Sequence, residues 1–448
     1  MNRREFMALG AAAALSPRIV RAQQLRAERP RPTPAQLEWQ RDELAMFLHF
    51  GVNTFTDREW GDGTEDPTIF NPERFDARQW ARAAKAGGFR AMILTAKHHD
   101  GFCLWPTKTT THSVASSPWR GGQGDVLREM VDACRAESLK VGVYLSPWDR
   151  NAPVYGDSPR YNDFYIEQLT ELLTRYGPIA EVWFDGANGE GPNGKRQTYD
   201  WPRVWSTVRR LQPNAVMFSD AGPDVRWIGN ERGVAGTTNW STVDPAVVPF
   251  PGATGDAVMR MLQQGDPNGS AWRPGETDVS IRPGWFHHTA EDARVKSVDD
   301  LVGLYFTSVG RNSKLLLNVP PTRAGLLSDV DVSRLAGLRS RLDSIFDRDI
   351  ATGVRTFWSP ADRTLNVDLG QTVRFSIADL REDVTGGQTV SSYLLEREGA
   401  RGLVPVCEGT TIGFRKLERF PAVEAQRLRL TIRDAVDAPR GISLGLFP

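Results

Sequence analysis

Short runs of apolar residues alternate with stretches of helical periodicity from Leu44 onward. Each run has the length of a strand, and each stretch between runs repeats its apolar residues with the 3.6-residue period of a helix that buries one face. The eight strand-like runs cover residues 44–53, 90–95, 140–145, 181–185, 215–219, 226–229, 278–282 and 314–319. Strand followed by helix, repeated in this way, predicts a parallel sheet closed into a (β/α)8-like barrel.

Capping residues mark the ends of several predicted helices. Asp76 and Asp125 stand where helix N-caps belong, and Gly177 followed by Pro178 ends a helix whose apolar positions begin at Tyr165. The sixth and seventh units are poorly defined. Residues 239–276 are rich in Gly and Pro, and we expect long loops there on the catalytic face of the barrel.

The pattern changes after residue 350. Val373, Phe375 and Ile377 alternate with polar residues, as do Leu428 and Leu430, and this period of two is typical of strands with one buried face. We therefore expect a barrel domain over residues 30–348 and a C-terminal antiparallel β-domain over residues 350–448.

Composition excludes several classes of protein. The 448 residues are 40% hydrophobic and 25% charged, which fits a folded chain rather than disorder, collagen or a membrane bundle. Lys plus Arg equals Asp plus Glu at 55 each, so no net positive charge attracts nucleic acid. The 14 Trp suit either a large core or a surface that stacks on sugar rings.

The N-terminus resembles a bacterial export signal. Arg3 and Arg4 precede Phe6 and a short apolar run, and Val20 and Ala22 have the spacing of a small-residue cleavage site. We expect residues 1–22 to be a twin-arginine signal peptide that sends the protein to the periplasm or beyond. The apolar run is too short to span a bilayer, so no membrane insertion is expected after its removal. The alternative is an ordinary basic N-terminus with an amphipathic helix.

Three cysteines, Cys103, Cys134 and Cys407, lack the spacing of a metal site, and their odd number argues against a disulfide framework. Cys134 falls on the apolar face of a predicted helix, so we expect it to be a small buried hydrophobe.

Polar side chains stand where the first four predicted strands end. His49 ends the first strand, His98 and His99 end the second, Tyr144 lies near the end of the third, and Asp185 ends the fourth. Catalytic residues of barrel enzymes lie at these C-terminal strand ends. Aromatic and acidic residues also follow predicted strands: Glu59 and Trp60 follow the first, Trp105 follows the second, and Trp285 follows the seventh. Flat rings beside hydrogen-bonding groups predict a carbohydrate site.

Glycoside hydrolysis needs two carboxyl groups, and Asp185 has two candidate partners in the sequence. Glu231, which lies in a Gly-rich loop, and Glu276 both lie near strand ends, so position leaves both open.

Two competing readings remain. One is a metal-dependent hydrolase that uses His98, His99, His287 and His288. Adjacent residues of a strand point to opposite faces, which disfavours a shared ion at His98 and His99. The other is a non-catalytic sugar-binding barrel, which predicts loss of a catalytic carboxylate.

Seven stretches together resemble the α-L-fucosidases of glycoside hydrolase family 29: FLHFGVNTF, TAKHHDGFCLWPT, VGVYLSPWD, VWFDGANG, RWIGNE, DVSIRPGWFHH and LLLNVPP. The resemblance covers residues 47–321. It implies a (β/α)8-like barrel followed by a β-sandwich, no cofactor and no metal. It also implies a fucosylated oligosaccharide or glycoconjugate as substrate, hydrolysed with retention of configuration through a covalent fucosyl-enzyme.

The resemblance assigns roles to individual residues. It implies Asp185 as nucleophile and, through RWIGNE, Glu231 as acid/base in the branch of the family that acts on α-1,3 and α-1,4 linkages of branched glycans. The family commonly has Tyr where this chain has His287, so no contact is implied for His287. The expected substrate-binding residues are His49, Glu59, Trp60, His98, His99, Trp105, Tyr144, Glu276 and Trp285.

Overall fold

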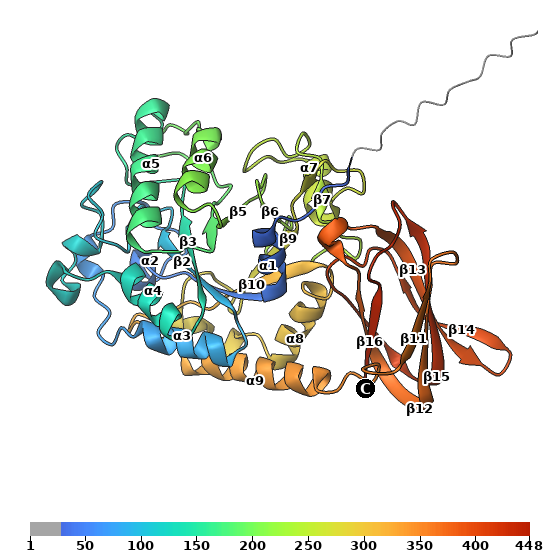
Figure 1. Cartoon of the computed structure of the whole chain (residues 1–448). Helices are drawn as coiled ribbons and strands as arrows, with labels where there is room; N and C mark the ends of the chain where they lie inside the picture. The colour runs from blue at the N-terminus through green and yellow to red at the C-terminus, as the bar shows by residue number, and fades with distance from the viewer. Residues whose placement is uncertain (1–27) are drawn as a thin grey trace, which may run out of the picture.

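The computed structural model describes residues 28–448 (Figure 1). The predicted signal peptide, residues 1–22, lies outside this range. None of the helices within residues 28–448 has the length and apolar character needed to cross a membrane.

Eight parallel strands form a closed barrel in the order β1-β10-β9-β6-β5-β4-β3-β2. All eight predicted runs contribute a strand, so the predicted barrel is confirmed. The strands are β1 (Leu44–Leu48), β2 (Ala91–Lys97), β3 (Lys140–Leu145), β4 (Glu181–Trp183), β5 (Val216–Ser219), β6 (Val225–Trp227), β9 (Gly275–Ser280) and β10 (Ser313–Asn318).

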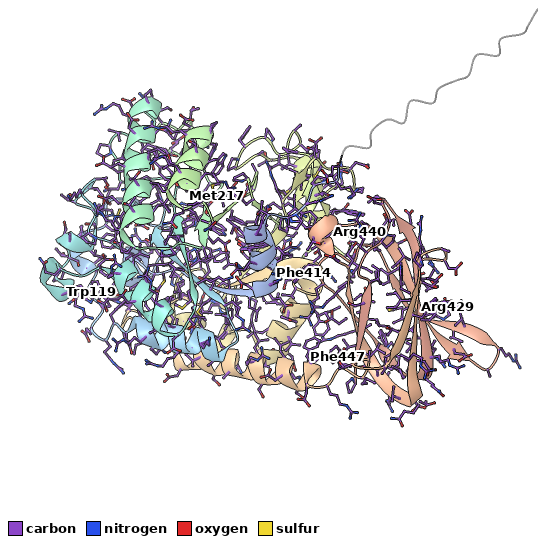
Figure 2. All side chains as sticks on the ribbon, viewed as in Figure 1. Trp119, Met217, Phe414, Arg429, Arg440 and Phe447 are labelled. Carbon is purple, nitrogen blue, oxygen red and sulfur yellow. The ribbon has the colours of Figure 1, made fainter. Side chains whose placement is uncertain are left out.

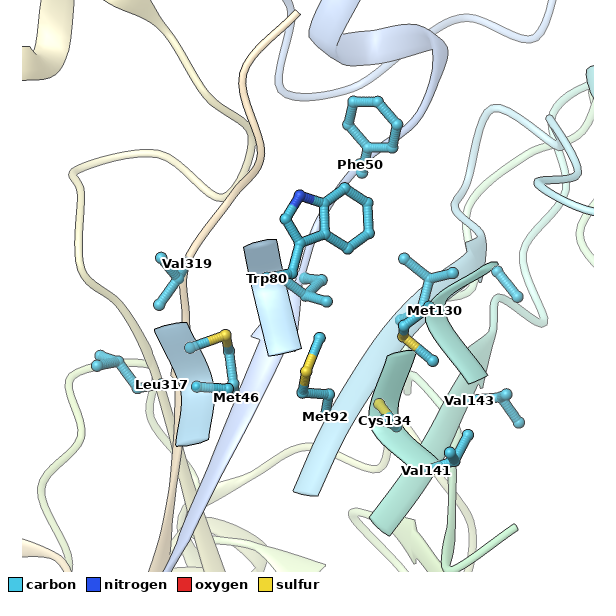
Figure 3. Close-up of a cluster of buried hydrophobic side chains, with 14 of the residues drawn as sticks. Met46, Phe50, Trp80, Met92, Met130, Cys134, Val141, Val143, Leu317 and Val319 are labelled. Atoms are coloured by element: carbon cyan, nitrogen blue, oxygen red, sulfur yellow. The ribbon is translucent and has the colours of Figure 1, made fainter. Parts of the chain in front are cut away.

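The barrel strands alternate between two apolar environments. Met46 and Met92 point outward and join the core beneath the helices, whereas Ala45, Phe47 and Ile93 fill the barrel interior. Both faces are buried, which explains why the strands are continuous apolar runs. Figure 3 shows the outer cluster, in which Met46 and Met92 lie near Trp80, Met130 and Cys134.

Cys134 is fully buried on α4, which confirms that it packs as a small hydrophobe.

Helices cover the barrel where the periodicity predicts them. Asp76 and Asp125 are the N-caps of α3 and α4, and each accepts a hydrogen bond from the helix backbone. The α-helices are α1 (Pro34–Asp42), α2 (Val52–Thr56), α3 (Ala77–Ala86), α4 (Val126–Ala136), α5 (Ser158–Arg175), α6 (Trp201–Leu211), α7 (Asp256–Gln264), α8 (Val298–Thr307) and α9 (Asp329–Phe346). Short 3-10 helices are η1 (Pro67–Ile69), η2 (Val114–Ser116), η3 (Trp119–Gly122), η4 (Thr289–Arg294) and η5 (Val384–Gly386).

The sixth and seventh strand–helix units, which the sequence pattern defines poorly, depart from the regular alternation of a (β/α)8 barrel. No helix separates β5 from β6, and the chain between β6 and β9 forms a two-stranded antiparallel sheet of β7 (Thr242–Val243) and β8 (Ala271–Trp272), with α7 between these strands in the sequence. The expectation of loops throughout residues 239–276 is wrong, because α7 forms there. α7 has only nine residues and lies between Gly255 and Gly265, so the surrounding Gly and Pro residues conceal its helical pattern in the sequence.

The C-terminal region is an antiparallel sheet of six strands, shown in red in Figure 1. Its strands are β11 (Arg355–Ser359), β12 (Thr364–Arg381), β13 (Val390–Gly399), β14 (Gly402–Gly409), β15 (Lys416–Ala435) and β16 (Ser443–Phe447). The long strands β12 and β15 shift register in their middle. One half of each pairs within the layer that contains β11 and β13, and the other half of β12 pairs with β16. Side chains from both halves share one core, as a β-sandwich requires.

An ion-paired cluster joins the sheet to the barrel. Arg415 donates to Glu43 at 2.8 and 2.9 Å and pairs with Asp379 at 2.8 Å, and Tyr305 also donates to Glu43. Phe414 is labelled in Figure 2 between the two regions, and its backbone N–H donates to Oδ1 of Asn312 at 2.8 Å. Glu43 and Asn312 directly precede β1 and β10, so the sheet attaches to the N-terminal end of the barrel.

Candidate active site

Aromatic rings from several strands meet at the C-terminal end of the barrel. The ring centroid of His49 lies 5.5 Å from that of His98 and 5.0 Å from that of Trp285. His98 lies 4.2 Å from His99 and 5.9 Å from Tyr144. The structure therefore brings these predicted site residues together as one wall.

The expectation that His98 and His99 point to opposite faces is wrong. β2 ends at Lys97, so the two residues follow the strand and their rings lie side by side. Within residues 28–448, no group of three or more His, Cys, Asp or Glu side chains is arranged to hold a metal ion.

The three imidazoles are neutral hydrogen-bonding groups. Burial lowers the pKa of each, that of His49 to about 3. His49 shares a hydrogen bond of 2.9 Å with the amide oxygen of Asn318, and His99 one of 2.7 Å with the Ser146 hydroxyl. A neutral imidazole has one donor and one acceptor nitrogen, which suits the hydroxyl groups of a sugar.

Asp185 follows β4 and is held by three neighbours. Its Oδ1 accepts from the backbone N–H of Ala187 at 2.7 Å, and its Oδ2 accepts from the Tyr144 hydroxyl at 3.2 Å. Nε2 of His99 lies 3.8 Å from the same Oδ2. The Asp185 side chain remains 28% exposed, so its carboxylate is both fixed and accessible.

Glu231 lies on the loop after β6 and reaches the same site. Nε1 of Trp285 donates to its Oε2 at 3.3 Å. Partial burial of the carboxyl group raises the pKa of Glu231; the Trp285 hydrogen bond opposes this rise and the charge of Asp185 adds to it. A carboxyl group with a raised pKa is suited to donate a proton.

Glu59 fixes the loop that carries Trp285. Its two oxygens accept from the backbone N–H groups of Trp285 at 2.7 Å and Phe286 at 3.0 Å, and His288 bonds it at 2.6 Å. Burial alone would lower the pKa of His288, but hydrogen bonds to Asp57 and Glu59 raise it. Glu59 therefore positions Trp285 as well as lying at the site.

Trp60 is 59% exposed and packs edge-on against His99 and Trp148, with centroids at 6.0 and 5.8 Å. It presents an open indole face beside the imidazole wall.

A pocket of about 320 Å³ adjoins Asp185 and Glu231. Trp183 and Phe218, stacked with centroids 4.2 Å apart, both line it.

The sequence profile described as α-L-fucosidase matches residues 38–343, more than half of the chain. The chain belongs to the α-L-fucosidase family. It is 43% identical to α-L-fucosidase 1 of Arabidopsis thaliana, over 93% of this chain and 87% of the plant protein. The family is one of glycoside hydrolases, so the chain is an α-L-fucosidase by membership.

Solved structures of glycoside hydrolase family 29 share the fold. A member from an unknown rumen bacterium is 43% identical with a TM-score of 0.87, covering 94% of this chain and 77% of that one. A Ruminococcus gnavus fucosidase in complex with fucose is 31% identical with a TM-score of 0.84, covering 93% and 95%.

The structure of this α-L-fucosidase does not bring two predicted substrate contacts to the cleft. Trp105 is fully buried in the outer core, where its indole N–H donates to Glu171 at 2.8 Å. Glu276 is fully buried inside the barrel and accepts from the indole of Trp183 at 3.1 Å. Neither side chain has surface available to a substrate.

His287 is also largely buried, with Nε2 3.7 Å from Asp292, and burial lowers its pKa. His287 therefore lies on the loop that carries Trp285, with its ring beside Asp292.

Sequence reasoning missed two acids of this α-L-fucosidase that line the pocket. Asp220 directly follows β5, the same kind of position that drew attention to Asp185, and Asp278 lies within β9. Asp278 is 4% exposed, and its Oδ1 accepts from Nε1 of Trp227 at 2.8 Å. The strand-end rule could have found Asp220, whereas nothing in the pattern separates Asp278 from the other apolar-flanked acids.

Proposed function

We propose that this α-L-fucosidase is a retaining, exo-acting enzyme that removes terminal α-L-fucosyl groups through a covalent fucosyl-enzyme. The observation that carries the proposal is the placement of Asp185 and Glu231 on one pocket, with the Asp185 carboxylate fixed by Tyr144 and Ala187.

In the first step, a carboxylate oxygen of Asp185 attacks the anomeric carbon of fucose. A C–O bond to Asp185 forms as the glycosidic C–O bond breaks, and neutral Glu231 gives its proton to the departing sugar oxygen. The raised pKa of Glu231 supports this role.

In the second step, ionised Glu231 takes a proton from water as the water oxygen attacks the anomeric carbon. The bond to Asp185 breaks, and fucose leaves with its original configuration. Two inversions give net retention.

His49, His98 and His99 would bind the fucose hydroxyls, with the open rings of Trp60 and Trp285 against its apolar face. The fucose-bound relative from Ruminococcus gnavus supports the choice of sugar.

We further propose α-1,3 and α-1,4 linkages in branched glycans as the preferred bonds, on the basis of the RWIGNE segment that carries Glu231. The test is incubation with matched fucosylated oligosaccharides that differ only in linkage, with the anomer of released fucose followed by NMR. Initial release of the β-anomer, or preference for an α-1,2 linkage, would contradict the respective part of the proposal.

Export by the twin-arginine route is also a proposal, and it rests on Arg3, Arg4 and the short apolar run. Replacement of both arginines by lysine should retain fucosidase activity in the cytoplasm of the host. Normal export of that variant would contradict the route.

A further inference from the structure

Two acids face each other inside the barrel, below the catalytic pocket. Glu181 on β4 and Glu276 on β9 are 1% and 0% exposed, and their side chains lie within hydrogen-bonding reach of each other. Among residues 28–448, Lys314 on β10 is the one cation that pairs with either acid, at 3.1 Å from Glu181. Two carboxylates beside one ammonium group would leave a negative charge uncompensated in a closed interior, which is costly.

The hydrogen bonds of the two acids leave one oxygen of each without a donor. Glu181 Oε2 accepts from Nζ of Lys314 at 3.1 Å and from Nε1 of Trp39 at 2.9 Å. Glu276 Oε1 accepts from Nε1 of Trp183 at 3.1 Å. In the described part of the chain, no N–H group or hydroxyl donates to Glu181 Oε1 or to Glu276 Oε2, although both atoms are buried. One proton between these two oxygens would satisfy both.

The surroundings favour Glu276 as the acid that holds this proton. Glu181 accepts from an ammonium group and an indole, which stabilise its charge, whereas Glu276 has one neutral donor. Burial raises the pKa of Glu276 well above its ordinary value and the charge of Glu181 adds to the rise, while Lys314 opposes it. The other side chains of this interior cluster are apolar or aromatic, and Asp278 lies two residues further along β9.

The indole that bonds Glu276 belongs to the wall of the catalytic pocket. Trp183 ends β4 and lines that pocket together with Asp185. It stacks on Phe218 and its ring centroid lies 5.3 Å from that of Tyr144. The Tyr144 hydroxyl donates to Asp185. A displaced indole would therefore disturb both the pocket wall and the ring that holds the Asp185 carboxylate.

We propose that Glu276 is a positioning residue, whose neutral carboxyl group donates a hydrogen bond to Glu181, accepts one from Trp183 and thereby fixes this indole below the nucleophile. The inference rests on the proposed role of Asp185 and adds a residue that does not touch the sugar. Because the carboxyl group acts as one donor and one acceptor, an amide of the same shape can replace it. An apolar side chain leaves the indole N–H and an oxygen of Glu181 without partners.

The first experiment measures kcat and KM of the full chain with an aryl fucoside. Glu276→Gln keeps both hydrogen bonds and should stay within about twofold of the unmodified protein. Glu276→Met should lower kcat per folded molecule by roughly tenfold to a hundredfold, because small misplacements at a catalytic site are costly. In a Trp183→Phe background, which lacks the indole N–H, Glu276→Met should cause little further loss of kcat.

A second buried acid supplies the control for packing. Glu171 accepts a hydrogen bond of 2.8 Å from the indole of Trp105, and this pair lies in the outer core away from the catalytic pocket. Glu171→Met makes the same change of side chain as Glu276→Met. It should lower stability and leave kcat per folded molecule unchanged.

The proton has two readouts that do not depend on activity. The infrared spectrum of the unmodified protein minus that of Glu276→Gln should show the carbonyl band of a protonated carboxyl group at neutral pH. Unfolding releases this proton, because the raised pKa of folded Glu276 returns to near 4.5 in the unfolded chain. Relative to Glu276→Gln, the unfolding constant of the unmodified protein should therefore increase about tenfold per pH unit from about pH 5.5 until the pKa of folded Glu276 is reached.

The outcomes separate this proposal from the proposed function. If the unmodified protein releases no fucose, the proposed function fails, and the two proton readouts still test the shared proton. Equal loss of kcat in Glu276→Gln and Glu276→Met, or an equal loss in Glu171→Met, overturns the positioning role while the function stands. If Glu276→Met does not fold, Glu276→Gln decides: the absence of the carbonyl band, or a ratio of unfolding constants that does not change with pH, overturns the proposal.

Discussion

Two pairs of acids on the same barrel have opposite environments. Asp185 and Glu231 line an open pocket at the C-terminal end, whereas Glu181 and Glu276 lie in the barrel interior and are 1% and 0% exposed. Lys314 lies 3.1 Å from Glu181, and burial together with the charge of Glu181 raises the pKa of Glu276. The interior pair is compensated by a cation and closed to substrate. Access and an uncompensated charge, rather than residue type, distinguish a catalytic pair from a structural one.

Substitution of Asp185 should have the largest effect on activity. Asp185→Ala should reduce kcat/KM by on the order of 10⁴-fold or more, because no group remains to form the covalent intermediate. Added azide should then attack fucosyl fluoride directly and give a fucosyl azide of inverted configuration, identified by NMR. An azide of retained configuration would mean that another residue is the nucleophile.

Glu231 and its interior counterpart Glu276 form a matched pair of substitutions. Glu231→Gln should reduce hydrolysis of a fucosyl oligosaccharide by about 10²- to 10⁴-fold, because the leaving sugar is no longer protonated. With fucosyl fluoride, azide should restore turnover and give a product of retained configuration, since azide needs no general base. Glu276→Gln should show no such rescue. Rescue at Glu276 alone would reverse the assignment.

The role of the interior pair, Glu181 and Glu276, can be tested by substituting Lys314 and measuring the stability of the protein. Lys314→Met removes the cation from buried Glu181 and should lower the free energy of unfolding by about 3 to 5 kcal/mol, measured by urea denaturation. Lys85→Met, an exposed position on α3, should change it by less than about 0.5 kcal/mol. A large loss of kcat in the folded Lys314 variant, with stability unchanged, would place the interior acids in the catalytic site.

The smallest effect concerns pH. Glu231 must carry a proton in the first step, and its raised pKa keeps it protonated to higher pH than an ordinary glutamate. The kcat/KM for a fucosyl oligosaccharide should therefore decrease about tenfold per pH unit above the pKa of Glu231. The same profile with fucosyl fluoride should lack this alkaline decrease, because fluoride leaves without that proton. An identical decrease with both substrates would assign the ionisation to a different group.

The sequence predicted the barrel because eight buried strands leave eight continuous apolar runs, and it predicted His49, His98, His99, Tyr144 and Asp185 because polar residues at strand ends are conspicuous. The alternating two-residue period also predicted the C-terminal sheet. These features depend on local pattern, which a sequence contains directly.

The sequence does not show how deep in the barrel a side chain of a given strand lies. Glu276 and Asp278 share the inward face of β9, yet one is enclosed beside Trp183 and the other lines the pocket. Trp105 follows a strand that leads to the site, but its loop returns the indole to the outer core against Glu171. Both outcomes depend on tertiary contacts between residues far apart in the chain.

The cluster of Arg415, Glu43 and Asp379 gives the two ends of the barrel separate tasks. The C-terminal sheet is anchored where the strands begin, and the glycan approaches where they end. Insertions or substitutions in the catalytic loops can therefore alter substrate choice without disturbing the junction between the two regions. The junction in turn can be strengthened without touching the reaction, which makes it the natural place to engineer heat resistance into this scaffold.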